Sequence, residues 1–262
     1  MLEVALHQLA VSPDTRENLA RVLSLLERFD ADLSVFPEYL MGVPPGGLTA
    51  EYVESAAEPL EGEFVGSIAD KTRERDLAAV VHVYLREDDR VYNAALLVDR
   101  GSVRAVYRKI HLFDAYGYRE SDLFAKGSEP VVVSLGSFTV GLAVCFDLRF
   151  PELFRAMALR GADLFVVPAA WYRGPYKEEQ WLALTRARAH ENAAFLVAVD
   201  QTGPLFSGRS TVVTPMGHAL LDLGQEERSV SVILDPSEVK EAREKVPVLS
   251  LLRKELYRAW YA

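Results

Sequence analysis

The chain has 262 residues, of which 50% are hydrophobic and 26% are charged, and its formal net charge is −9 at pH 7. This composition is typical of a globular protein with a sizeable core, and the charge argues against a nucleic-acid binder, which would present a basic face. No apolar run approaches the roughly 20 residues that a membrane-spanning helix needs, so we expect no membrane contact. Residues 1–10 contain an acid and lack a basic start, which favours a first strand over a signal peptide.

Hydrophobic periodicity predicts strands that alternate with helices, the pattern of an α/β protein. The predicted strands are 2–10, 32–37, 78–85, 92–98, 103–107, 131–135, 139–144, 163–167 and 195–200, with three more between 210 and 234. The predicted helices are one that follows the candidate N-caps Ser12 and Asp14, then 61–75, 151–160, 177–192 and 236–245. The remaining segments are a Gly- and Pro-rich loop at 42–47, expected to form a pocket wall, irregular chain at 108–129, a loop at 168–176 and a tail at 246–262.

The strand–helix–strand arrangement of the first third recurs after residue 139, and no low-complexity linker divides the chain. We therefore expect one domain, residues 1–262, with two sheets whose outer faces are covered by helices.

Cys145 is the only cysteine, which excludes an intramolecular disulfide and is typical of a cytoplasmic protein. It lies where a strand ends and the chain turns toward a helix that begins at Pro151. A thiol held there becomes a nucleophile when a base removes its proton. A lone cysteine behind an apolar run is more often a buried core residue, so a catalytic role depends on partners elsewhere.

Two further residues offer such partners. Glu38 follows a buried strand at its carboxyl end, where open α/β sheets place their sites, although it could also cap a helix. Lys109 runs along apolar surface, where an ammonium needs nearby carboxylates to stay charged. Glu120 is one candidate carboxylate, and its alternative is an exposed loop charge.

Together these residues could cleave a C–N bond. Glu38 would take the thiol proton of Cys145 as general base, and the thiolate would attack a carbonyl carbon. Lys109 and the backbone N–H of Phe146 would stabilise the oxyanion, while Glu120 would hold Lys109 in place. Ammonia would leave, and water would release an acid from the thioester.

The segments VFPEY, YRKIHLF and GLAVCFDLRFPEL resemble, in order, the three signature regions of the nitrilase (carbon–nitrogen hydrolase) superfamily. The resemblance continues through GADLFVVPAAW, TRARAHEN and FSGRSTVVTPMG, so it covers almost the entire chain. It implies a four-layer α-β-β-α sandwich and a homodimer or larger assembly. It also implies a catalytic Glu–Lys–Cys triad at Glu38, Lys109 and Cys145, with Glu120 as the second glutamate.

Within this superfamily, Phe146-Asp147 in place of Trp-Glu counts against a nitrile substrate. CFDLRFPE followed by RGADL most resembles the omega-amidase and deaminated-glutathione amidase branch. That resemblance implies hydrolysis of a terminal amide of a small carboxylated molecule such as 2-oxoglutaramate. The alternatives are an N-carbamoyl-amine amidohydrolase, a catalytically idle binding subunit and a redox-sensing thiol, the last disfavoured because no second cysteine could resolve it.

Two arginines could bind a substrate carboxylate in a bidentate manner, Arg149 and Arg173. For Arg149, an ion pair with Asp147 or Glu152 is the more ordinary explanation. Because there is no cysteine cluster, no H-E-x-x-H pattern and no phosphate-binding Gly spacing, we predict neither a metal nor a cofactor.

Aromatic residues could contribute in two further places. Tyr39 and Trp171 could shape the cavity, although aromatic side chains are more often simple packing. In the C-terminal tail, Leu256, Trp260 and Tyr261 could dock across a partner subunit or pack on their own core.

Overall fold

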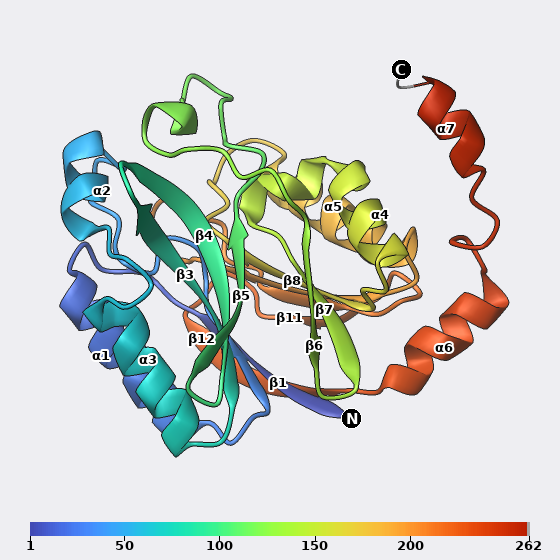
Figure 1. The fold of residues 1–262 in the computed structure, drawn as a ribbon, viewed down its shortest axis with the longest axis horizontal. Helices are drawn as coiled ribbons and strands as arrows, with labels where there is room; N and C mark the ends of the chain where they lie inside the picture. Colours follow the sequence, from blue (N-terminus) through green and yellow to red (C-terminus); the bar gives the residue numbers. More distant parts are fainter. Residues whose placement is uncertain (261–262) are drawn as a thin grey trace.

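The computed structural model describes residues 1–260, which form two six-stranded sheets that pack against each other (Figure 1). In spatial order the first sheet contains β12 (Arg228–Leu234), β1 (Leu2–Gln8), β2 (Leu33–Val35), β3 (Ala78–Glu87), β4 (Arg90–Asp99) and β5 (Ser102–Arg108). The second contains β11 (Ala219–Asp222), β10 (Thr211–Val213), β9 (Phe195–Asp200), β8 (Leu164–Ala169), β7 (Phe138–Leu142) and β6 (Val131–Leu135). In each sheet the central three strands, β1–β2–β3 and β7–β8–β9, are parallel and the outer ones antiparallel.

Helices cover the outer faces of both sheets, which confirms the predicted α-β-β-α sandwich. The α-helices are α1 (Thr15–Arg28), α2 (Ala50–Ala56), α3 (Glu63–Glu74), α4 (Pro151–Leu159), α5 (Lys177–His190), α6 (Pro236–Lys245) and α7 (Lys254–Trp260), and the 3-10 helices are η1 (Glu120–Asp122) and η2 (Cys145–Arg149). Figure 1 shows α1 and α3 on the first sheet and α4 and α5 on the second. Within residues 1–260, no helix has both the length and the apolar character that crossing a membrane requires.

The two faces of β3 show how the sequence builds these layers. Successive side chains of a strand point to opposite faces. Accordingly, Ala78 and Val80 enter the core between the sheets, whereas Ala79 and Val81 enter the core beneath α1 and α3. Because both faces are covered, the buried part of the strand from Ala78 to Leu85 is apolar on both faces, apart from His82, rather than alternating.

Several element boundaries differ from the sequence prediction. Helices α2 and α7 were not predicted, because each has only seven residues and little apolar periodicity. The strand before the cysteine ends at Leu142 instead of Val144, since the chain already bends into η2. Pro168 lies inside β8 rather than in a loop. Its missing N–H is tolerated because the pairing of β7 with β8 stops at Val166.

Two buried histidines predict how stability responds to acid. Burial lowers the pKa of both His7 and His82 to about 3, whereas an unfolded histidine has a pKa of about 6.5. Between these pKa values the unfolded chain binds more protons than the folded chain. The contribution of the two neutral histidines to stability is therefore complete above about pH 6.5 and is lost as the pH falls toward 3. We expect the free energy of unfolding, measured by urea titration, to fall by about 1.4 kcal/mol per pH unit for each histidine below pH 6.

The variant His7→Gln, which keeps a polar side chain but does not titrate, separates this effect from general acid sensitivity. Between pH 6 and pH 5, this variant should reduce the slope of the unfolding free energy against pH by about 1.4 kcal/mol per pH unit, the amount expected for one histidine. An identical slope in the parent and the variant would contradict the assignment of His7.

Candidate active site

Glu38 and Cys145 both follow the carboxyl ends of central parallel strands, β2 and β7, so the fold brings them together between the sheets. Glu38 follows a strand of the first sheet but is bound to the second. Its N–H donates to the carbonyl oxygen of Ala169 at 3.2 Å, and the N–H of Ala170 donates to its Oε2 at 2.9 Å. The side-chain amide of Gln201 donates to the Glu38 carbonyl oxygen at 2.7 Å. The carboxylate is therefore held rigidly from both sheets.

Lys109, directly after β5, places its ammonium between two carboxylates. Its Nζ lies 2.8 Å from Glu38 Oε1 and 2.9 Å from Glu120 Oε2, and all three side chains are at most 1% exposed. Burial by itself disfavours the ammonium, but the charges of Glu120 and Glu38 outweigh it and raise the pKa of Lys109 well above its ordinary value. Lys109 is therefore charged, and the structure brings it together with the carboxylates that the sequence analysis named.

Asn93 on β4 joins the same cluster, and sequence reasoning missed it. Its Nδ2 donates to Glu38 Oε1 at 2.8 Å and to Glu120 Oε1 at 2.7 Å. His82 sets this orientation: its Nδ1 accepts from the N–H of Tyr39 at 3.0 Å, so its Nε2 carries the proton and donates to Asn93 Oδ1 at 2.7 Å. A polar amide inside an otherwise apolar predicted strand was the available signal.

Glu120 receives two further hydrogen bonds. The hydroxyl of Tyr39 donates to its Oε1 at 3.2 Å, and the N–H of Phe113 donates to its Oε2 at 2.6 Å. Tyr39 itself adopts a left-handed backbone with φ of 59°. The side chain that the sequence analysis expected to shape the cavity thus lines it and also holds the second glutamate.

Cys145 begins η2 with φ of 43°, a left-handed conformation that costs energy for a residue with a Cβ. Asp147 holds this turn: its Oδ2 accepts from the N–H of Val144 at 2.9 Å and from the hydroxyl of Tyr107 at 2.8 Å. Its Oδ1 accepts from the N–H of His111 at 3.1 Å. The strained turn is therefore anchored to the first sheet and to the chain after Lys109.

Burial raises the pKa of the Cys145 thiol well above its ordinary value, and the negative charge of Glu38 acts in the same direction. The positive charge of Lys109 and the N–H of Ala170 oppose this shift only in part. At neutral pH the sulfur is consequently a thiol, and it needs a base to become a nucleophile.

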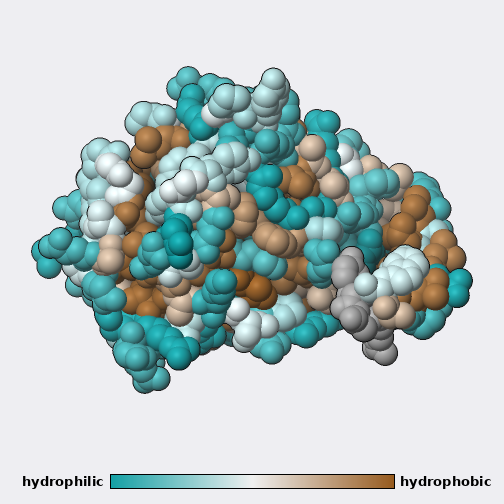
Figure 2. Space-filling model, turned by 90° about the horizontal axis from the view of Figure 1, so that it is seen from above, coloured by the Kyte–Doolittle hydropathy of each residue, from teal (hydrophilic) through white to brown (hydrophobic). Residues whose placement is uncertain are grey.

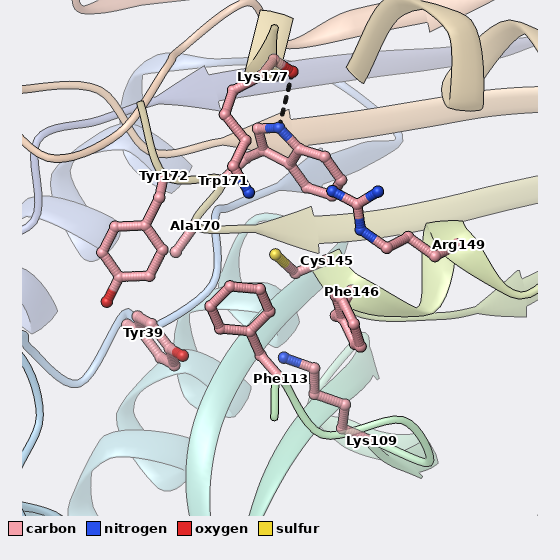
Figure 3. A pocket seen from close by; sticks show the side chains of 10 residues that line it. All are labelled: Tyr39, Lys109, Phe113, Cys145, Phe146, Arg149, Ala170, Trp171, Tyr172 and Lys177. Carbon is pink, nitrogen blue, oxygen red and sulfur yellow. Dashed lines mark hydrogen bonds between the residues drawn. The ribbon is translucent and has the colours of Figure 1, made fainter. Parts of the chain in front are cut away.

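The Cys145 sulfur faces a small inner cavity of about 20 Å³ (Figure 3). The residues that line it are Tyr39, Lys109, Phe113, Cys145, Phe146, Arg149, Ala170, Trp171, Tyr172 and Lys177. An outer cavity of about 570 Å³ adjoins it, and the two share Phe113, Tyr172 and Lys177. The predicted 42–47 loop contributes Pro45, Gly46 and Gly47 to the outer wall.

Arg149 lines the inner cavity beside Trp171, and its environment corrects one expectation. Its Nη2 donates to Gln180 Oε1 at 2.7 Å, and its guanidinium carbon lies 4.8 Å from the Trp171 ring centroid. Among the described residues Arg149 forms no ion pair. The preferred explanation, an ion pair with Asp147 or Glu152, was therefore wrong. Both oxygens of Asp147 are already hydrogen-bonded, Oδ2 to Val144 and Tyr107 and Oδ1 to His111.

The other predicted contacts divide between the two cavities. Phe146 and Trp171 line the inner cavity. Arg173 lines only the outer cavity, and its Nε donates to the carbonyl oxygen of Phe206 at 2.6 Å. Two lining residues, Phe113 and Lys177, were not predicted as site residues. The sequence placed Phe113 only in an irregular segment and Lys177 only at the start of a helix.

The hydrogen bonds of the Asn93 amide predict how a substitution at this position changes stability. Asn93→Asp keeps the shape but removes a donor from both glutamates and adds a third acid beside them. We expect the free energy of unfolding at pH 7 to fall by about 2–4 kcal/mol, because buried acceptors lose donors and like charges approach. The matched control is Asn192→Asp, at a second fully buried asparagine whose Nδ2 donates only to the Arg188 carbonyl oxygen. Equal losses in the two variants by urea unfolding would contradict the role of Asn93.

Comparison with known proteins agrees with this geometry. Residues 3–244 match the carbon-nitrogen hydrolase family. The chain is 32% identical to the deaminated glutathione amidase of Escherichia coli O157:H7, with 94% of this chain and 95% of the relative covered. It is 33% identical to the 2-oxoglutaramate amidase of Paenarthrobacter nicotinovorans, covering 87% and 81%. A solved amidase structure from Nesterenkonia sp. superposes with a TM-score of 0.81 at 31% identity, covering 99% and 96%. The chain therefore belongs to the carbon–nitrogen hydrolase (nitrilase) family and is a hydrolase that acts on carbon–nitrogen bonds.

Proposed function

We propose that the protein hydrolyses the terminal amide of a small carboxylated molecule, such as 2-oxoglutaramate, to the acid and ammonia through a thioester on Cys145. The observation that carries this proposal is that Lys109 and Cys145 line one buried cavity, where the Lys109 ammonium is paired with the carboxylate of Glu38. The substrate class is supported by the names of two relatives, a 2-oxoglutaramate amidase and a deaminated glutathione amidase.

In the first half of the reaction, the Glu38 carboxylate accepts the Cys145 thiol proton while the sulfur attacks the amide carbon. The C=O electrons move onto oxygen, and the Lys109 ammonium and the Phe146 N–H stabilise that oxyanion. When the oxyanion collapses, the C–N bond breaks, Glu38 returns its proton to the departing nitrogen, and ammonia leaves. A base is required at this step because burial raises the pKa of the thiol.

In the second half, water attacks the thioester carbon and Glu38 accepts a proton from that water. Collapse of the second oxyanion breaks the C–S bond, and the sulfur recovers the proton. Lys109 stays charged throughout, since the carboxylate of Glu120 still raises its pKa while Glu38 holds the proton. In this scheme Glu120 and Asn93 are positioning residues that hold Lys109 and Glu38.

Ammonia release from 2-oxoglutaramate and glutaramate tests the proposal. Cys145→Ala should lower kcat/KM by at least about a thousandfold, because no covalent intermediate can form, and Glu38→Gln should do the same for lack of a base. Added hydroxylamine should divert the parent enzyme's thioester to a hydroxamate. Equal turnover by the parent and Cys145→Ala would rule out the nucleophile.

The same assay separates the alternatives. Carbon dioxide formed together with ammonia from an N-carbamoyl amine, at a higher kcat/KM than any amide, would identify an N-carbamoyl-amine amidohydrolase. No turnover of any amide, together with unreactive Cys145 toward iodoacetamide, would identify an idle binding subunit.

We further propose that the enzyme works in the cytoplasm as a homodimer or larger homo-oligomer in which the C-terminal tail docks on a partner subunit. The free thiol supports the reducing compartment. Leu251 and Trp260 are 71% and 67% exposed. Helix α7 lies at one end of the molecule in Figure 1, and Figure 2 shows apolar residues gathered at that end. Of the other tail residues named from the sequence, Leu256 is half-buried, and Tyr261 lies outside the described residues.

Sedimentation velocity tests the assembly. The parent should sediment as a dimer or larger species, and the double variant Leu251→Ser with Trp260→Ser should shift it toward the monomer, because exposed apolar contacts stabilise such interfaces. A parent that stays monomeric at micromolar concentration would refute the proposal.

A further inference from the structure

Lys177, the first residue of α5, stands where the inner and outer cavities meet and lines both. Its side chain is largely buried, with the residue 9% exposed. Its ammonium lies 3.7 Å from the ring centroid of Tyr116 and 5.7 Å from that of Phe113. The aromatic rings thus hold the ammonium at the junction between the two cavities.

No carboxylate neutralises this ammonium among the described residues. Lys177 forms no ion pair there, and the carboxylate of its neighbour Glu178 instead binds Arg209 at 3.0 Å. Of the other two cations that line the inner cavity, Lys109 is paired with Glu38 and Glu120, whereas Arg149 binds only the neutral Gln180 through its side-chain nitrogens. The cavity that contains the Cys145 sulfur is therefore lined by two cations without a counter-ion, an arrangement that is costly unless an anion binds.

The two cations flank one indole ring. The guanidinium carbon of Arg149 and the ammonium of Lys177 lie 4.8 Å and 5.6 Å from the Trp171 ring centroid. Figure 3 shows them on opposite sides of that ring, with the Cys145 sulfur facing the same cavity. Burial lowers the pKa of Lys177, and the positive charge of Arg149 acts in the same direction, so an anion beside Lys177 would stabilise its ammonium.

We propose that Lys177 is a specificity-determining residue that binds the anionic group of the substrate where the two cavities meet, while the amide lies against Cys145. This inference rests on the proposed amidase function and assigns the carboxylate of the substrate to the junction of the inner and outer cavities. Charge-assisted hydrogen bonds inside an aromatic, water-poor cavity favour a carboxylate over a neutral group of the same shape. Arg173 is excluded from this role, because it lines only the outer cavity.

Glutaramate and its neutral near-isostere, glutaric diamide, isolate the anionic group, with initial rates measured for both. In Lys177→Met the ratio of kcat/KM for glutaramate to that for the diamide should fall about 10- to 100-fold, the effect of one lost charge-assisted hydrogen bond, mainly through a higher KM. Lys177→Arg should recover part of the ratio because it restores the charge.

Two control variants sharpen the test. Lys245→Met removes an ammonium that is 67% exposed and paired with Glu241, and it should leave the ratio unchanged. Arg173→Met should leave it unchanged as well. A ratio in Lys177→Met within about twofold of the parent, or a fall in Arg173→Met as large as that in Lys177→Met, would overturn the proposal, where twofold is about 0.4 kcal/mol.

Protection of Cys145 tests the same idea without turnover. Glutarate should slow the alkylation of Cys145 by iodoacetamide in the parent, and the half-protecting concentration should rise about 10- to 100-fold in Lys177→Met. The same half-protecting concentration in both proteins would overturn the assignment. If the parent protected its thiol with glutarate but hydrolysed no amide, the amidase proposal would fail and the anion site would stand. Thermal unfolding of each variant confirms that it is folded.

Discussion

The site depends on one ammonium, Lys109, that is shared by two buried carboxylates. Removing two negative groups and one positive group from water is expensive, and a single cation cannot compensate both carboxylates. The remaining demand is met by donors: the amide of Asn93, the hydroxyl of Tyr39 and backbone N–H groups. Since these donors come from both sheets, the cluster exists only when the two sheets are packed together.

The same requirement explains why Cys145 can be strained and still well placed. Its left-handed backbone is held by Asp147, whose carboxylate is bonded to the hydroxyl of Tyr107 on the first sheet. Gly141 in β7 permits the close approach of α4, because a Cβ there would lie 2.9 Å from the sulfur of Met157. Packing on both sides of β7 therefore fixes the turn that carries the sulfur. Burial, together with the negative charge of Glu38, raises the pKa of its thiol, so catalysis needs a base.

Charge is arranged differently on the two sides of the sulfur. On the Glu38 side, Lys109 and neutral donors together compensate the two carboxylates within the protein. On the Arg149 side, the described residues supply no counter-ion to Arg149 or Lys177, although the chain as a whole carries a formal charge of −9. Both cations lie against the indole ring of Trp171. In the proposed function, the substrate enters through the outer cavity, and its reacting amide is recognised in the inner one.

The sequence by itself determined the layered architecture, because apolar runs of strand and helix length alternate twice along the chain. It also determined Glu38, Lys109 and Cys145 as candidates, since each lies beside an apolar segment where a polar or reactive group is unusual. Glu120 was a candidate as a carboxylate partner for Lys109, and the family resemblance implied the same residue. Only the tertiary structure decided which groups touch: the Asn93 bridge, the corrected environment of Arg149 and the unpaired Lys177. These depend on contacts between residues far apart in the chain, and neither periodicity nor composition carries information about which distant side chains meet across two packed sheets.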